Sequence, residues 1–169
     1  MVATICILCY NLRKYCPLYW SIWRSLWQYV LFFGHSDTSN KIEVKLKEVI
    51  TDLIKKHNVN EFYVGTHGNF DNIVKKTLIE LKNIYPHITY TIVLSHLNFP
   101  KEHKTENYTN YIYPENFENT PPKYDIIRRN RWLIEQSDYV ITYVEHTLSN
   151  AYKFKEIAEK KGKIVINII

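Results

Sequence analysis

Short uncharged runs of β-branched and aromatic residues alternate along the chain with segments whose apolar residues recur at helical spacing. The uncharged runs predict five strands, at residues 29–34, 62–65, 88–94, 139–144 and 163–169. The periodic segments predict four helices, one from Ser39 or Asn40 to Asn58, two at residues 71–84 and 121–135, and a last one that begins near Asn150. Because strands and helices alternate, we expect a doubly wound, mainly parallel five-stranded sheet with helices on both faces.

Two segments depart from this alternation. Residues 95–120 are polar, and a loop of about 26 residues in a compact domain is usually functional or disordered. Residues 1–28 carry three of the four tryptophans and are expected to be an accessory segment outside the domain at residues 29–169. Arg24 and Pro17 interrupt its apolar run, so we expect no membrane-spanning helix there. An interfacial helix and residues added by an upstream start codon both remain open.

Composition narrows the class of protein. The chain has 169 residues, a formal net charge of +5 and a 46% hydrophobic content, which suit one domain with its own core. The lysines are scattered as on solvated helix faces, so we expect no nucleic-acid partner. All three cysteines, Cys6, Cys9 and Cys16, precede the expected domain. The cysteine-free body excludes a disulfide scaffold and fits a cytoplasmic protein.

Polar corners follow the predicted strands, and in a parallel sheet they all lie at one edge, where open α/β folds bind ligands. The candidate ligand-binding residues of these corners are Gly34, His35, Ser36 and Asp37 after the first strand, Gly65, Gly68 and Asp71 after the second, and His146, Thr147, Ser149 and Asn150 after the fourth. The glycines fit either a tight turn or the close approach of a phosphate or sugar. No G-x-G-x-x-G fingerprint or Walker loop is present, which disfavours an ordinary dinucleotide or P-loop site.

The helix at residues 121–135 contributes cationic candidates. Arg128, Arg129 and Arg131 stand shortly before the fourth strand, and the planar guanidinium group suits phosphate. Surface ion pairs with Asp125 and Glu135 explain these arginines equally well. The helix that begins near Asn150 would also favour an anion, because its first N–H groups lack intrahelical partners.

A metal centre is the competing interpretation of the same edge. Several histidines and carboxylates follow strands and could converge on a metal: His35, His67, His96, His146, Asp37, Asp71 and Glu145. No H-x-x-H or H-x-D spacing is present, and a single histidine at a strand end more often bonds a loop. We therefore assign no metal and no cofactor to the chain.

Three runs of the sequence resemble the SLOG superfamily of Rossmann-like proteins, which is named for the Smf/DprA proteins and the LOG enzymes. The runs are F-F-G-H-S-D-T, F-Y-V-G-T-H-G-N-F-D and R-R-N-R-W-L-I-E-Q-S-D-Y-V-I-T-Y-V-E-H-T. They occur in the order of the family and are most similar to its YpsA-like branch of small bacterial proteins. The resemblance covers residues 29–169 and implies a Rossmann-like fold that binds a nucleotide or nucleotide derivative.

The resemblance also implies roles for particular residues. The R-K-x-x-M run of the LOG enzymes falls on residues 129–133, so Arg129 matches their catalytic arginine, and Asn130 and Arg131 are expected beside the ligand. Their P-G-G-x-G-T-x-x-E run ends at Glu156, which matches the catalytic glutamate. The glycines of that run are replaced by Ser149, Asn150 and Tyr152. Side chains there would narrow the approach of a phosphate, whereas Ser and Asn remain good N-caps.

These departures favour binding over catalysis. We expect a sensory or regulatory protein that binds a nucleotide-like small molecule, with a protein partner and a homo-oligomer both open. The alternative is a LOG-like phosphoribohydrolase that cleaves the N-glycosidic bond of a nucleoside monophosphate, in which Arg129 holds the substrate and Glu156 assists departure of the base. A DNA-associated protein of the Smf/DprA type is the third interpretation. We expect no membrane partner apart from the tryptophan-rich segment.

Overall fold

The computed structural model describes residues 28–94, 110–112 and 122–169. The elements in chain order are β1 (Tyr29–Gly34), a 3-10 turn η1 (Asn40–Ile42), α3 (Glu43–His57), β2 (Glu61–Val64), α4 (Asn69–Ile84), β3 (Thr89–Val93), β4 (Asn110–Ile112), α5 (Pro122–Gln136), β5 (Tyr139–Tyr143), α6 (Asn150–Lys160) and β6 (Ile164–Asn167). The expected accessory segment lies outside the described residues except for Gln28.

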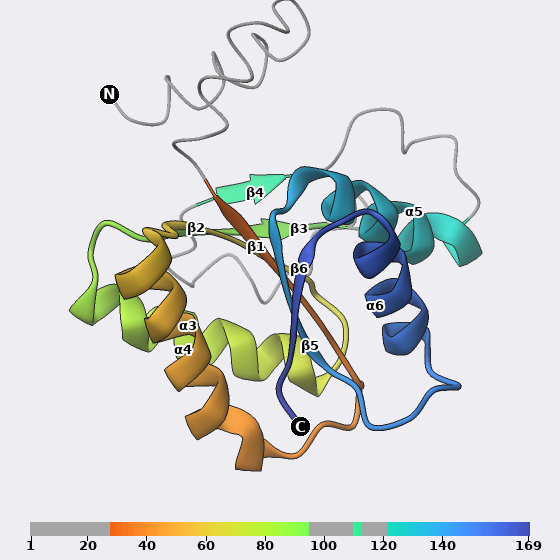
Figure 1. Cartoon of the computed structure of the whole chain (residues 1–169), viewed down its shortest axis with the longest axis horizontal. Coiled ribbons are helices and arrows are strands. Elements are labelled where there is room, and N and C mark those ends of the chain that lie inside the picture. The colour runs from red at the N-terminus through yellow and green to blue at the C-terminus, as the bar shows by residue number, and fades with distance from the viewer. Residues whose placement is uncertain (1–27, 95–109, 113–121) are drawn as a thin grey trace, which may run out of the picture.

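The strands form one parallel sheet in the order β4-β3-β2-β1-β5-β6, which confirms the Rossmann-like, doubly wound fold (Figure 1). The prediction of five strands was wrong by one. The sixth, β4, is a three-residue edge strand within the polar segment at residues 95–120, where Thr91 to Val93 of β3 pair with it. A strand this short carries too few positions to show the alternation that marks a strand in sequence.

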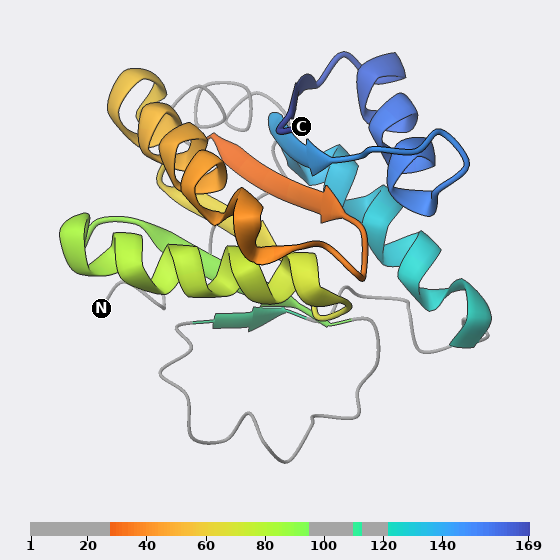
Figure 2. The same ribbon diagram turned by 90° about the horizontal axis from the view of Figure 1, so that it is seen from below.

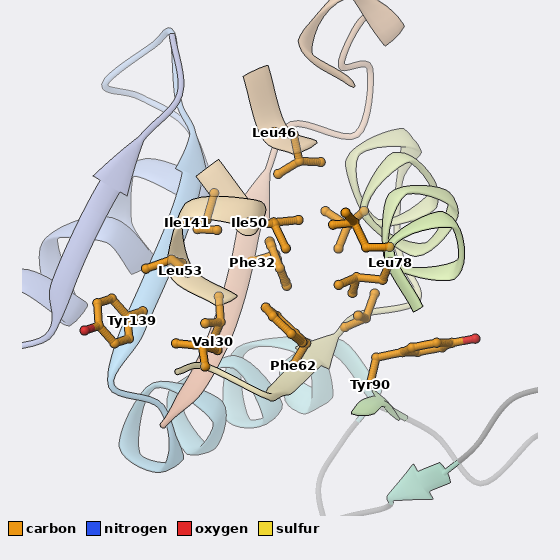
Figure 3. Packing of buried hydrophobic residues seen from close by; sticks show 14 of the residues in the cluster. Val30, Phe32, Leu46, Ile50, Leu53, Phe62, Leu78, Tyr90, Tyr139 and Ile141 are labelled. Atoms are coloured by element: carbon orange, nitrogen blue, oxygen red, sulfur yellow. The ribbon is translucent and has the colours of Figure 1, made fainter. Parts of the chain in front are cut away.

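Two helices cover each face of the sheet, α3 and α4 on one side and α5 and α6 on the other (Figure 2). Successive strand residues point to opposite faces, so Val30 and Phe32 of β1 join the core under α3 and α4, while Leu31 and Phe33 face α5 and α6. Figure 3 shows the first of these cores, with Phe32 of β1 and Phe62 of β2 beneath the helices. These two rings stack with their centroids 6.2 Å apart.

Local signals set the helix ends. α3 ends at Asn58, which adopts the left-handed conformation at φ 53° and whose backbone N–H donates to the carbonyl of Leu53. Asparagine is one of the few residues that accept this conformation, so the predicted end is confirmed. α6 begins after Ser149, whose side-chain oxygen accepts from the N–H of Tyr152 as an N-cap.

The order of the strands determines where a site can lie. Within the sheet, β2 and β3 lie on one side of β1, and β5 lies on its other side. The corner after β1 leads to α3 and the corner after β5 leads to α6, on opposite faces. The point between these two corners is the topological switch point, where ligands bind in open α/β sheets.

Candidate functional site

The corners after β1 and β5 meet at the switch point through His35. The backbone N–H of Glu145 donates to His35 Nε2 at 3.2 Å. The ring of His35 also lies 5.8 Å from that of His146 and 6.1 Å from that of Tyr143, measured between centroids. Two of the candidate residues, His35 and His146, are therefore brought together.

The corner after β2 packs against the corner after β1. The N–H of Asn69 donates to the carbonyl of Ser36 at 2.8 Å, and the Asn69 side chain donates to the carbonyl of Thr38 at 2.6 Å. Gly68 adopts φ +93°, and a Cβ there would stand 2.7 Å from Ser36 Cα. This position thus needs glycine both for its backbone conformation and for the close approach of the two corners.

The other two candidate glycines provide space for neighbouring side chains. A Cβ on Gly34 would lie 2.2 Å from Cγ of Phe70, and a Cβ on Gly65 would lie 2.4 Å from Oδ2 of Asp71. The structure therefore gives Gly34, Gly65 and Gly68 a packing reason that requires no ligand.

Asp71 is the most perturbed acid of this edge. Its side chain is buried in the first turn of α4, where one carboxylate oxygen accepts from the N–H of His67 at 2.9 Å. Burial raises the pKa of Asp71 from 3.8 to about 6, against the opposing effects of the Arg129 charge, the His67 hydrogen bond and the Lys75 charge. A buried carboxyl group that titrates near neutral pH is a feature of functional sites.

Arg129 approaches the same edge from the opposite face of the sheet. It is only 4% exposed, and its Nε and Nη2 donate to Oδ1 of Asn130 at 3.0 Å and 2.9 Å. Its Nη1 points to the carbonyl of Val93, the last residue of β3, at 3.5 Å. Burial lowers the pKa of Arg129, while the nearby Asp71 carboxylate raises it. Arg129 and Asp71 are thus two buried groups near the ends of β2 and β3, and the charge of each acts on the pKa of the other.

The remaining candidates lie nearer the surface. Asp37, Arg131, Thr147 and Asn150 are exposed, and Ser149 is half-buried as the N-cap of α6. Because Ser149 already accepts from the N–H of Tyr152, the amides of Asn150 and Ala151 are the ones on which an anion could be held. Glu156 is half-buried on α6, five residues after the buried Ala151.

Residues that the sequence did not single out hold the corners in place. Asn167 Oδ1 accepts from the Val144 N–H at 3.1 Å and from the Thr142 hydroxyl at 3.0 Å, and its amide donates to the Val144 carbonyl at 3.3 Å. An asparagine in the otherwise apolar run I-V-I-N-I-I is the signal that marks it. Phe70, which stacks on Tyr143 with centroids 6.4 Å apart, carried no signal beyond its apolar character.

The described ranges bear on two further expectations, a metal centre and a membrane-spanning helix. No group of three or more His, Cys, Asp and Glu side chains is arranged there to hold a metal ion, and His96 lies outside those ranges. Over the same part of the chain, no helix has the length and apolar character to cross a membrane. Comparison of the chain with models of protein families and with curated proteins gave no match.

Proposed function

We propose that this chain binds a nucleotide or nucleotide-derived ligand at the carboxyl edge of its sheet, in a sensory or regulatory role. The observation that carries the proposal is the meeting of the corners after β1 and β5 at the switch point, from which α6 begins. A crevice at this point is the usual ligand position in open parallel sheets, and a helix N-terminus favours phosphate. The resemblance to the SLOG superfamily supports the choice of a nucleotide.

The chemistry of the edge fits such a ligand. The amides of Asn150 and Ala151 offer donors to a phosphate, and the exposed hydroxyl of Thr147 lies in the same corner. Asp37 in the opposite corner is an exposed carboxylate that could accept from sugar hydroxyls. These groups come from both sides of the switch point, so a ligand between the corners would contact both.

The state of Arg129 supports binding without turnover. In the LOG-like mechanism this arginine holds the substrate, yet here its guanidinium group is buried and donates to Asn130 and towards Val93. A guanidinium group that already donates to protein acceptors gains less binding free energy from a ligand than an exposed guanidinium group does. Together with the loss of glycines at Ser149 and Asn150, this favours a binding protein.

A phosphoribohydrolase is the second candidate, and Asp71 favours it. Its pKa of about 6 allows this buried carboxyl group to hold or release a proton near neutral pH, which is what acid catalysis of base departure needs. Only the hydrolase releases free base, so one assay separates the two functions.

The test is calorimetric titration of the full chain with a panel of nucleoside 5′-monophosphates, followed by chromatography of each mixture for free base. We expect binding of at least one nucleotide with no base released. Base release that Asp71→Asn or Glu156→Ala abolishes would establish the hydrolase instead. No binding by any member of the panel would refute both functions.

A pair of charge variants locates the site. Asn150→Glu places a carboxylate at the first turn of α6, which suits the helix dipole but repels a phosphate. We expect roughly tenfold weaker binding, the effect of about 1–2 kcal/mol of charge repulsion at a partly solvated site. Asn83→Glu makes the same change in charge at the exposed far end of α4, and its affinity should equal that of the wild type. Equal affinities for both variants would place the ligand elsewhere.

A further inference from the structure

The hydrogen bond between the two switch-point corners depends on the protonation of a histidine. The Glu145 N–H donates to His35 Nε2, so that nitrogen must carry its lone pair and the ring must be neutral with its proton on Nδ1. Imidazole is the side chain that most readily changes charge between pH 5 and 8. A doubly protonated ring has no acceptor, so the bond to Glu145 cannot persist in that state.

The groups that face His35 determine how the corner responds. From β5 and the corner after it, His35 meets the rings of Tyr143 and His146 and the amide of Glu145. The pKa of Tyr143 is raised by a side-chain hydrogen bond to Glu145, then by burial and by the charges of Glu145 and Asp37. The carboxylate of Glu145 is therefore engaged by the Tyr143 hydroxyl while its amide is engaged by His35.

Packing on the other side leaves the corner after β1 fixed. The corner after β2 meets it through the backbone of Gly68 and Asn69 against Ser36, and the Phe70 ring of α4 packs against Gly34 at the end of β1. The corner after β5 is exposed from Glu145 to Leu148. Asn167 and Phe70 hold the start of this corner at Val144 and Tyr143. If the bond between the corners breaks, the exposed part that begins at Glu145 is therefore the part that can move.

We propose that His35 is a pH-sensitive latch, which in its neutral form holds the corner after β5 against the corner after β1 and on protonation releases it. The added proton goes to Nε2, and the Glu145 amide turns away from the ring. Protonation of His146 as well would add repulsion between two cationic rings. The carboxylates of Glu145 and Asp37 are the other charges of this region, and both act on the neighbouring Tyr143. The latch is independent of any ligand, and only its effect on access to the crevice rests on the proposed function.

The experiment is an NMR titration of the full chain between pH 8 and pH 5. It follows the His35 ring nitrogens, the Glu145 amide shift and the Glu145 hydrogen-exchange protection factor, corrected for intrinsic exchange. We expect the Glu145 amide to titrate together with the His35 ring and its protection to fall roughly fivefold, the fold-change that corresponds to loss of one ordinary hydrogen bond. A Glu145 amide that is unchanged while His35 titrates would overturn the latch.

Matched variants separate the latch from its surroundings. His35→Gln retains an acceptor oxygen that does not titrate, so the Glu145 amide should lose its response to pH in this range. His146→Gln should retain the response, because it keeps His35. A response that survives His35→Gln or disappears in His146→Gln would assign the titration to another group and refute the proposal.

A ligand measurement distinguishes this proposal from the proposed function. Affinity for adenosine 5′-monophosphate is measured at pH 7.5 and pH 5.5 for the wild type and His35→Gln, so that titration of the phosphate itself affects both proteins alike. We expect a larger change in affinity with pH for the wild type, and equal changes would overturn the link between latch and crevice. Absence of binding with a titrating Glu145 amide would count against adenosine 5′-monophosphate as the ligand and leave the latch intact.

Discussion

Replacing Asp71 by asparagine should change how the stability of the protein depends on pH. The carboxyl group is buried beside Gly65, and its folded pKa is about 6 against an ordinary value of 3.8. The folded state therefore binds the proton more tightly than the unfolded state. A group of this kind contributes stability that is fully present below its unfolded pKa and is lost as the pH rises through its folded pKa.

The magnitude follows from the two pKa values. A shift from 3.8 to about 6 corresponds to about 3 kcal/mol in the free energy of unfolding, of which about 1 kcal/mol is already lost at pH 4.5. The remaining loss of about 2 kcal/mol falls between pH 4.5 and pH 8. Asp71→Asn removes this titration, and its amide oxygen can still accept from the His67 N–H. The free energy of unfolding of the variant minus that of the wild type should therefore rise by about 2 kcal/mol over this interval.

Urea denaturation of both proteins at several pH values measures this difference. The pKa of Glu61, which burial raises to about 7, affects wild type and variant alike and cancels. A constant offset from the altered charge interaction with Arg129 also leaves unchanged the slope of the difference against pH. A difference that stays flat within about 0.5 kcal/mol, or that falls with rising pH, would refute the buried and perturbed state of Asp71.

Three further predictions test the packing and the charges around the site. Gly34→Ala should lower the free energy of unfolding by about 2–3 kcal/mol in urea denaturation, because its Cβ would meet the Phe70 ring. Gly162→Ala, at φ +70° but with open space around the Cβ, should lower it by only about 1 kcal/mol. Equal losses for the two variants would contradict the packing role of Gly34. Arg129→Met should raise the pKa of Asp71 above 6 in a carboxyl NMR titration, because the attraction of the guanidinium charge is lost, and an unchanged or lower pKa would argue against the pair. Asn167→Leu should cost about 1–3 kcal/mol in thermal or urea unfolding, since it leaves the Val144 N–H without its acceptor, and a loss under about 0.5 kcal/mol would show that the corner does not need this brace.

The fold was predictable because its central strands, β1, β2, β3 and β5, are buried on both faces. Runs such as residues 139–144 contain no charge, and helices such as α3 carry an apolar face and a left-handed asparagine at the end, so local preference and tertiary packing agree. β4 was not predictable, because Asn110–Ile112 is an edge strand whose pairing with β3 comes from tertiary contact.

The candidate site was predictable in position and less so in detail. The corners follow from the sheet, and His35 and His146 do lie together. The sequence does not reveal that the space beside Gly34 holds Phe70, or that Arg129 is buried against Asn130 while Arg131 is exposed. Such facts depend on side chains from distant segments that meet only in the folded chain. The same reason hides the partners of Asn167, which lie on the preceding strand and its corner.

The most direct test of nucleotide binding is amide NMR mapping of the full chain with the monophosphate that binds best in calorimetry. We expect the largest shift changes in the corner after β1, at Ser36 and Asp37, and from Glu145 to Ala151 across the corner after β5 and the first turn of α6. Changes confined to the opposite edge of the sheet, at Asn60, Glu61 and Asp138, would contradict a ligand site at the switch point.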